Sequence, residues 1–451
     1  MCYNIIEKQG DVFMSKYYFI GIKGSGMSSL AQVLFDLGND VIGYDDNKNH
    51  AYTEIELEKR GIKIYYETPD LSSDTIVVRT SAVRDNHKEI INAKNLGLKI
   101  YQYFELLGEL TDKYRTVAIS GCHGKTTTTA LLAHIFSETV GCSYIIGDGT
   151  GVADKNSDLF FIEACEYCRH FLNYHPTYTI ITNVELDHPD YYKDLEDYKS
   201  AFQAFADQTK KTVIAWGDSE IIRSLNLKDK LYYGFNENND VICKNLELKT
   251  DGSSFDIYIK GEYYNHFELP LLGKHMVLNS LAVITMCYLE GLDKDTVNNE
   301  IHTFKGAKRR FAENFIGDIV TVDDYAHHPT EVAATISAAR QKYPYKEIVA
   351  VFKPNTYSRT RELYKDFITA LDTADKAYVT DITCDRELPE EFPGVTSDLI
   401  IDGLKNGEHI GDDTIDKLLK HKNAVLLFMS CKDIYTMKGN FEKLLKETNE
   451  N

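Results

Sequence analysis

The stretch "AISGCHGKTTTT", from Ala118 to Thr129, combines two glycines with a lysine and several hydroxyl or thiol side chains. Glycines let backbone N–H groups approach phosphate oxygens, and the N-terminus of a following helix adds positive partial charge. Lys125 would reach the β- and γ-phosphates of a nucleotide, and the Thr126 hydroxyl would bind Mg²⁺. The first glycine comes two residues later than in G-x-x-x-x-G-K-[ST], so a tight turn is the structural alternative. The strand predicted before the loop and the helix predicted after it favour nucleotide binding.

Acidic and histidine side chains follow two further apolar runs. The run "LFFIEACE" ends in Glu163 and Glu166, and "TNVELDHPD" contributes Asn183, Glu185, Asp187, His188 and Asp190. A carboxylate at the end of a buried strand can hold Mg²⁺ beside phosphates, and a histidine among acids suits a second divalent ion. We expect Glu166 and His188 to be metal ligands. For an isolated pair of acids, a solvated strand end would be the simpler interpretation.

The N-terminal turn "GIKGSGMSS" follows a predicted strand and begins a predicted helix. Gly24, Ser25 and Gly26 resemble a dinucleotide fingerprint, but Ser29 stands at the position of its last glycine. Asp45, about 20 residues further on, is placed to hold a ribose. The pattern indicates a diphosphate ligand, with a structural turn as the alternative.

Two polar groupings occur in the last third of the chain. "KRRF" contains Lys308, Arg309 and Arg310, which form either a solvated face or a clamp on a transferring phosphoryl group. A small polar pocket is predicted from side chains of "DDYAHHP" and "TYSRTR", namely Tyr325, His327, His328 and Arg359. Because the planar guanidinium of arginine recognises carboxylates, this pocket suits a small acid.

Short apolar runs alternate with helical periods throughout the chain, which predicts α/β units with parallel sheets. We expect one unit up to about residue 112, a second that begins at "RTVAIS", and a third after the basic, glycine-containing "FKGAKRRFAE". Residues 242–270 alternate with a period of two and contain turn signals at Asp251-Gly252 and Lys260-Gly261. They are predicted to form antiparallel strands.

Composition limits the function further. The chain has 451 residues, enough for about two to four domains, and 43% are hydrophobic. A net charge of -19 argues against bulk binding to nucleic acid or to an anionic membrane. Nine scattered cysteines are typical of reduced thiols in a cytoplasmic protein. The N-terminal "MCYNIIEKQGDVFMSKYYF" has no signal-peptide pattern, and Met14 is a candidate natural start.

Six segments resemble the Mur ligase family in order and spacing, over nearly the whole chain. They are "GIKGSGMSSLAQ", "GDGTG", "EACEYCRHFLNY", "TNVELDHPDY", "GAKRRF" and "DDYAHHPTE". The family's phosphate loop has the short form G-x-x-G-K-T, which accounts for the late first glycine. The likeness is greatest to the branch of the family that joins L-alanine to UDP-N-acetylmuramate.

This resemblance implies a three-domain α/β architecture. A Rossmann-like N-terminal domain (residues 1–112) would bind the UDP-sugar, a P-loop ATPase-like central domain (113–308) would bind ATP, and a Rossmann-like C-terminal domain (309–451) would bind the amino acid. The implied reaction is ATP-dependent ligation of L-alanine to UDP-N-acetylmuramate through an acyl phosphate, with Mg²⁺. It is a cytoplasmic step of peptidoglycan synthesis. We expect a monomer or weak homodimer with no nucleic-acid partner and no membrane insertion.

The resemblance also implies roles for individual residues. The catalytic residues would be Lys125, Glu166, His188 and Arg310, and the metal ligands Thr126, Glu166 and His188. The nucleotide would be bound by Gly121, Cys122, His123, Gly124, Lys125, Thr126, Thr127, His275, Asn279 and Asp324. The UDP-sugar would be bound by Gly24, Ser25, Gly26, Met27, Ser28, Asp45 and Ser81. The amino acid would be bound by Tyr325, His327, Asn355 and Arg359.

Several positions depart from the family pattern. Met276 follows His275 where the family usually has asparagine, and Asn355 replaces a histidine. Ser430 and Lys432 replace glycines of a loop near the end of the chain. Because most departures fall in the third domain, a preference among L-alanine, glycine and serine stays open.

Three other functions remain as alternatives. One is a recycling ligase that joins a ready-made peptide to the same sugar nucleotide. The second is a non-catalytic paralogue that binds the UDP-sugar, which the intact Lys125, Glu166 and His188 disfavour. The third is a nicotinamide-dependent oxidoreductase, which the missing final glycine of the N-terminal turn and the second phosphate loop disfavour.

Overall fold

The computed structural model describes residues 14–384 and 387–450. The proposed N-terminal extension before Met14 lies outside the described residues. The chain divides into two compact units. Of the described residues, the first unit comprises residues 14–116, 139–163 and 173–175. The second comprises residues 117–138, 164–172 and 176 onwards.

The first unit contains a parallel five-stranded sheet in the order β3-β2-β1-β4-β5. Its strands are β1 Lys16–Ile20, β2 Asp40–Tyr44, β3 Lys63–Tyr65, β4 Thr75–Arg79 and β5 Lys99–Gln102. Its helices are α1 Ser25–Asp36, α2 Glu54–Lys59, α3 Lys88–Asn95 and α4 Tyr103–Thr111. Strand order reverses at β1, so the turn after β1 lies at the topological switch point, where α/β sheets bind ligands.

Three more strands belong to the first unit: β7 Ser143–Ile146, β8 Thr150–Val152 and β9 Leu159–Glu163. β7 pairs antiparallel with β8 and parallel with β9. At Gly151, in β8, an added Cβ would clash with the backbone of Ser29 in α1. The "GDGTG" segment therefore lets β8 and α1 pack closely.

The second unit contains a sheet in the order β15-β14-β13-β12-β11-β10-β6. It is parallel from β6 to β13 and antiparallel from β13 to β15, which confirms the antiparallel prediction for residues 242–270. The strands are β6 Arg115–Ser120, β10 Tyr178–Ile181, β11 Thr212–Trp216, β12 Lys230–Gly234, β13 Val241–Lys249, β14 Gly252–Ile259 and β15 Glu262–Leu269. The accompanying helices are α5 Lys125–Ser137, α6 Leu195–Asp207, α7 Glu220–Arg223, α8 Lys274–Leu289, α9 Lys294–Thr303 and the 3₁₀ segment Tyr167–Asn173.

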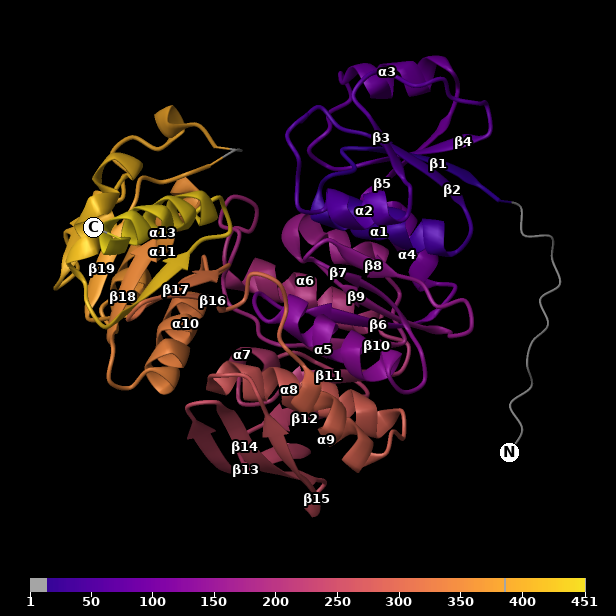
Figure 1. Cartoon of the computed structure of the whole chain (residues 1–451). Helices are drawn as coiled ribbons and strands as arrows, with labels where there is room; N and C mark the ends of the chain where they lie inside the picture. Colours follow the sequence, from indigo (N-terminus) through magenta and orange to yellow (C-terminus); the bar gives the residue numbers. More distant parts are fainter. Residues whose placement is uncertain (1–13, 385–386, 451) are drawn as a thin grey trace. The chain divides into compact units, whose positions relative to one another are not determined.

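A six-stranded sheet follows in the same unit, in the order β16-β17-β21-β18-β19-β20 (Figure 1). Only the β16–β17 pair is antiparallel among its described pairs. The strands are β16 Ala312–Ile316, β17 Ile319–Asp324, β18 Glu347–Phe352, β19 Lys376–Val379, β20 Gly407–His409 and β21 Ala424–Met429. The helices are α10 Pro329–Lys342, α11 Tyr357–Leu371, α12 Asp398–Ile401, α13 Tyr435–Glu450 and two 3₁₀ segments, Pro389–Glu391 and Asp412–Lys420.

Both faces of this last sheet are buried. One apolar cluster includes Val320, Ala350 and Leu427, and a second includes Val349, Leu426 and Phe428. Adjacent strand residues point to opposite faces, so a strand covered on both sides reads as a continuous apolar run, such as "AVLLFM". No helix in the described part of the chain is both long enough and apolar enough to span a membrane.

Candidate active site

The phosphate loop joins β6 to α5, as predicted. Gly121 has φ 131° and Gly124 has φ 82°, backbone conformations that favour glycine. A Cβ at Gly121 would clash with Thr182 Oγ1, and one at Gly124 would lie 2.6 Å from Asn279 Oδ1. The loop therefore fits closely against its neighbours only with glycine at both positions, and Asn279 lies directly beside it.

The Lys125 ammonium lies over this loop. It donates hydrogen bonds to the carbonyl oxygen of Gly121, to that of Cys122 at 3.3 Å, and to Glu166 Oε2 at 2.9 Å. Burial favours the neutral amine, but the negative charge of Glu166 outweighs it and raises the pKa of Lys125. Burial also opposes ionisation of Glu166, yet Lys125 and His188 lower its pKa to about 2. Both groups are therefore charged at neutral pH.

The structure brings Glu166 and His188 together and adds Asp187. His188 Nε2 lies 3.3 Å from Glu166 Oε1 and 3.7 Å from Asp187 Oδ2. Ligand atoms from the three side chains lie within 4.8 Å of one another. His188 also has a left-handed backbone, with φ 54°, an uncommon conformation for a residue other than glycine. We call Glu166, Asp187 and His188 the acidic cluster.

The acidic cluster has a donor set that fits a magnesium ion. It offers carboxylate oxygens and one imidazole, and Nδ1 of His188 is buried without a hydrogen-bond partner among the described residues. Hard divalent cations prefer such oxygen-rich sites. Thr126, the other predicted ligand, is the second residue of α5.

Asp187 links the acidic cluster to α11. Its Oδ1 accepts hydrogen bonds from Arg359 Nε at 3.1 Å and Nη2 at 2.7 Å. Arg359 is only 2% exposed. Burial would raise the pKa of Asp187, but the Arg359 charge holds it well below its usual range. A chain of charged and polar contacts thus runs from Lys125 through the acidic cluster to Arg359, the residue predicted to hold the amino acid.

The other predicted acceptor residues lie in two pairs. The Tyr325 and His327 rings lie 5.5 Å apart, and His327 Nδ1 lies 3.0 Å from the Tyr325 carbonyl oxygen. Arg359 Nη1 donates to the Asn355 carbonyl oxygen at 3.4 Å. The side-chain Oδ1 of Asn355 is buried and has no hydrogen-bond partner among the described residues.

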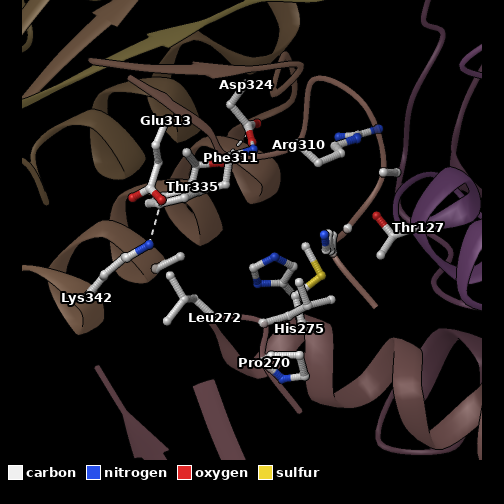
Figure 2. Close-up of a pocket in the computed structure, with 16 residues that line it drawn as sticks. Thr127, Pro270, Leu272, His275, Arg310, Phe311, Glu313, Asp324, Thr335 and Lys342 are labelled. Carbon is white, nitrogen blue, oxygen red and sulfur yellow. Dashed lines mark hydrogen bonds and ion pairs between the residues drawn. The ribbon is translucent and has the colours of Figure 1, made fainter. Parts of the chain in front are cut away.

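Two pockets adjoin the phosphate loop, and they share several lining residues. Thr127, His275, Met276, Arg310, Asp324 and Thr335 line both. Figure 2 shows the first pocket, where Pro270, Leu271 and Leu272 supply an apolar wall. The second pocket includes His123, Gly124 and Asn279. The structure therefore brings the predicted nucleotide-binding residues from distant segments to adjoining cavities.

Burial and neighbouring charges set the charge state or the contacts of three side chains that line these pockets. Burial and the charge of Arg310 lower the pKa of His275 to about 4, so its imidazole is neutral. Arg310 Nη1 lies 3.4 Å from Glu331 Oε1. Asp324 is buried, which raises its pKa, and it accepts hydrogen bonds from the backbone N–H groups of Phe311 and Ala326. Asp324 thus fixes the turn next to Arg310 as well as lining the cavities.

The predicted UDP-sugar residues belong to the first unit. Gly24 is the N-cap of α1, Ser81 follows β4, and β1 and β4 are parallel neighbours. The side chains of Met27 and Ser28 are buried, and Ser28 donates to the Thr53 carbonyl oxygen at 3.2 Å. Asp45 accepts from the backbone N–H of Lys23 at 3.0 Å, so it holds the turn in shape.

Some site residues were not predicted as such from the sequence. Asp187 and Glu185 were noted only as part of an acidic segment, and His328 only as part of a polar pocket. Glu331 was not singled out, although it follows "HHPT" as the third residue of α10 and forms a capping box with His328. The sequence feature that could have identified these residues is their position directly after a predicted strand or at the start of a predicted helix.

Three family models match consecutive segments that together cover most of the chain. They are the Mur ligase family, catalytic domain (residues 16–115), the Mur ligase middle domain (119–287) and the Mur ligase, glutamate ligase domain (309–431). The chain belongs to the Mur ligase family. The expected three-domain α/β architecture is thereby confirmed. As a Mur ligase the chain is an ATP-dependent amide ligase.

Three solved structures of ligases each resemble 96% of the chain. UDP-N-acetylmuramate-alanine ligase MurC from Thermotoga maritima is 26% identical, with a TM-score of 0.79 over 96% of this chain and 99% of that chain. A murein peptide ligase from Psychrobacter arcticus is 22% identical, with a TM-score of 0.69 over 96% and 98%. A pseudomurein peptide ligase type C from Methanothermus fervidus is 20% identical, with a TM-score of 0.64 over 96% and 100%. The last two likenesses show the fold alone.

Proposed function

We propose that this Mur ligase joins L-alanine to UDP-N-acetylmuramate with cleavage of ATP to ADP and phosphate, in the cytoplasm, as a step of peptidoglycan synthesis. The observation that carries the proposal is the convergence of Lys125, Glu166 and His188 at the ends of β6, β9 and β10. The likeness to the Thermotoga maritima alanine ligase supports the choice of substrates. We assign the UDP-sugar to residues 1–112, ATP to 113–308 and the amino acid to 309–451.

In the proposed reaction, a carboxylate oxygen of the muramoyl group takes the γ-phosphoryl group of ATP, and ADP leaves. The amine of alanine then attacks the acyl carbon, phosphate leaves, and the amine loses a proton. Catalysis of this kind consists mostly of positioning and charge stabilisation. Lys125 lies on the phosphate loop and is a cation at neutral pH, so it neutralises the phosphates.

The divalent ion is assigned to Thr126, Glu166 and His188, with Asp187 as an additional donor. When bound, Mg²⁺ neutralises developing charge on the phosphoryl oxygens. Glu166 keeps a carboxylate available because its pKa is about 2. Arg310 lines both pockets, where its guanidinium can contact a phosphoryl group.

We assign the amino acid to Tyr325, His327, Asn355 and Arg359. Because Asp187 already engages Arg359 through Nε and Nη2, the carboxylate of the amino acid must share or replace that partner. Asn355 offers a buried amide oxygen beside this arginine. The binding of the amino acid is therefore expected to be coupled to the acidic cluster.

An acceptor screen tests the proposal. The purified chain is incubated with ATP, Mg²⁺ and UDP-N-acetylmuramate, and phosphate release and product mass are measured with L-alanine, glycine, L-serine or a free tripeptide as acceptor. We expect the highest kcat/KM with L-alanine. Turnover with the tripeptide alone would favour the recycling ligase, and binding of the UDP-sugar without turnover would favour the non-catalytic paralogue.

A further inference from the structure

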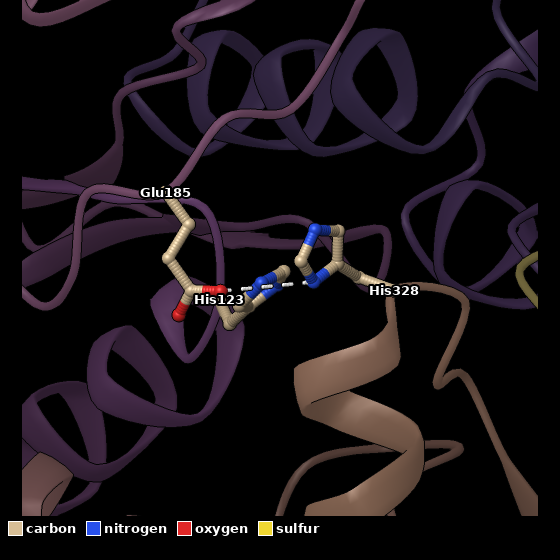
Figure 3. Close-up of side chains that lie close together, drawn as sticks. All are labelled: His123, Glu185 and His328. Atoms are coloured by element: carbon tan, nitrogen blue, oxygen red, sulfur yellow. Dashed lines mark ion pairs between the residues drawn. The ribbon is translucent and has the colours of Figure 1, made fainter. Parts of the chain in front are cut away.

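A second group of metal-ligand side chains lies beside the phosphate loop, outside the acidic cluster. It consists of His123 in the loop, Glu185 after β10 and His328 at the N-cap of α10 (Figure 3). One ligand atom from each side chain lies within 4.8 Å of the other two. We call these three residues the histidine cluster. Each comes from a different segment, so the tertiary fold and not local sequence brings them together.

The two imidazoles of the histidine cluster are buried and poorly satisfied. His123 is 8% exposed and His328 is 4% exposed, and their ring centroids lie 4.5 Å apart. Among the described residues, neither ring nitrogen of His123 has a hydrogen-bond partner, and Nε2 of His328 has none either. Buried polar atoms are normally paired, so this arrangement points to a ligand that takes up their lone pairs.

Neighbouring groups affect the orientation and the protonation of both imidazoles. Glu331 Oε1 lies 3.5 Å from His123 Nδ1, where a carboxylate orients the ring and leaves Nε2 for a ligand. Burial lowers the pKa of His328, and the carboxylates of Glu331 and Glu185 outweigh burial and raise the pKa of His123, so an ion that binds here displaces the proton of His123. His328 Nδ1 lies 3.9 Å from Glu185 Oε2 and accepts only a long, 3.4 Å hydrogen bond from Thr330 N–H.

We propose that His123, Glu185 and His328 bind a divalent transition-metal ion, of which Zn²⁺ is the best match. Two imidazole nitrogens and one carboxylate oxygen suit zinc, whereas magnesium prefers oxygen donors. Three protein ligands leave a fourth position open. Because His123 and Glu185 line the second pocket, that position is accessible to water or to an anionic oxygen of a bound molecule. The ion ties the phosphate loop to the first turn of α10.

Metal titration of the full chain without any substrate tests this site. Chelator-treated protein is titrated with Zn²⁺ against a chromophoric chelator in excess Mg²⁺, and with Co²⁺, whose visible absorption reports nitrogen ligation. We expect one equivalent of Zn²⁺ to bind. His328→Gln and Glu185→Gln should each weaken binding at least roughly tenfold, because each removes a ligand.

Two control variants separate this site from its neighbours. His327→Gln removes the adjacent histidine, and Glu166→Gln alters the acidic cluster; neither should change Zn²⁺ affinity. Circular dichroism verifies the fold, and the half-buried Glu185 provides a second variant if His328→Gln does not fold. Absence of stoichiometric Zn²⁺ binding, or loss of binding in Glu166→Gln but not in His328→Gln, would overturn the proposal. No substrate is present, so the result is independent of the proposed ligase reaction.

Discussion

The acidic cluster and the histidine cluster both contain residues of the segment after β10, yet different side chains surround them. In the acidic cluster, Lys125 and Arg359 provide positive charges for Glu166 and Asp187. In the histidine cluster, the carboxylate of Glu185 lies beside the imidazole of His328, and ring nitrogens of His123 and His328 have no hydrogen-bond partner among the described residues. Lysine and arginine thus pair with the carboxylates of the acidic cluster, whereas a histidine lies beside the carboxylate of the histidine cluster.

This difference indicates how each cluster can work. A pre-paired carboxylate is held charged and oriented, but a metal ion must share it with a protein cation. A metal ion that binds an unpaired ring nitrogen does not compete with a protein cation for it. Without the ion, however, the buried unpaired nitrogen lowers the free energy of unfolding. The contrast predicts strong stability effects in the acidic cluster and strong metal effects in the histidine cluster.

The largest expected effect is on stability, at the buried Asp187–Arg359 pair. Asp187→Asn leaves the buried Arg359 charge uncompensated and should lower the free energy of unfolding by about 3–5 kcal/mol. Urea unfolding measures this change. The side chain of Glu362, on the same helix, is 49% exposed and pairs with Arg361, so Glu362→Gln should cost less than about 1 kcal/mol. Equal losses for the two variants would contradict the importance of the buried pair.

The same pair predicts a pH dependence. The pKa of Asp187 is depressed in the folded protein, so its ionised form stabilises the fold fully above the unfolded value of about 3.9. That stability is lost as the pH falls through the lower, folded pKa. Asp187→Asn should therefore flatten the stability–pH curve below about pH 4 relative to the unmodified chain. Parallel curves for the two proteins would show that Asp187 does not titrate in this way.

The next effect is on the reaction barrier, at Lys125. Lys125→Ala removes the cation that neutralises the phosphates, so phosphate release should slow by roughly 10²–10³-fold, or about 2.7–4 kcal/mol of barrier. The loss also leaves buried Glu166 without its main counter-charge. Thermal unfolding therefore accompanies the kinetic assay. A folded variant with near-normal turnover would refute the role of this residue.

Glu166→Gln tests whether the acidic cluster holds the ion that ATP requires. The substitution keeps the shape and removes the charge, so the Mg²⁺ concentration for half-maximal turnover should rise by roughly 10–100-fold. The KM for L-alanine should change much less. An unchanged Mg²⁺ dependence would make Glu166 a structural partner of Lys125. Zn²⁺ affinity, measured on the same protein, should stay constant if the two clusters are separate.

Strand and loop order made part of these clusters predictable from sequence. Glu166 and His188 were expected to hold metal ions beside the phosphates because they follow predicted strands, and the structure places Glu166 next to both Lys125 and His188. The partners of Arg359 and Asp324 were not predictable. Arg359 pairs with a residue 172 positions away, and Asp324 is held by backbone N–H groups of the turn beside it. Such pairings depend on how helices pack onto sheets, which residue type alone does not encode.

Pattern matching also cannot tell a ligand contact from a structural one. Met27 and Ser28 lie in the first turn of α1, directly after the glycine-rich turn, yet their side chains are buried. Asp45 stands where a ribose ligand was predicted, and it caps the turn through Lys23 N–H. The pattern predicts a binding segment, whereas side-chain burial decides which of its groups can face a ligand.

The smallest expected effect concerns binding of the acceptor amino acid beside Arg359, the partner of Asp187. Arg359 is shared with Asp187, and Asn355 adds no charge of its own, so the carboxylate of the amino acid meets less positive charge than a histidine at position 355 would provide. Asn355→His should lower the KM for L-alanine by about fivefold, the difference between a neutral and a charge-assisted hydrogen bond. The KM for ATP should stay constant. L-Alaninamide, which lacks the carboxylate, is the matched control and should gain nothing from the substitution.

An equal gain for alanine and alaninamide would show that residue 355 acts on the amine or the methyl group. No change for either would place Asn355 outside the acceptor site and leave Arg359 as the sole cation in that assignment.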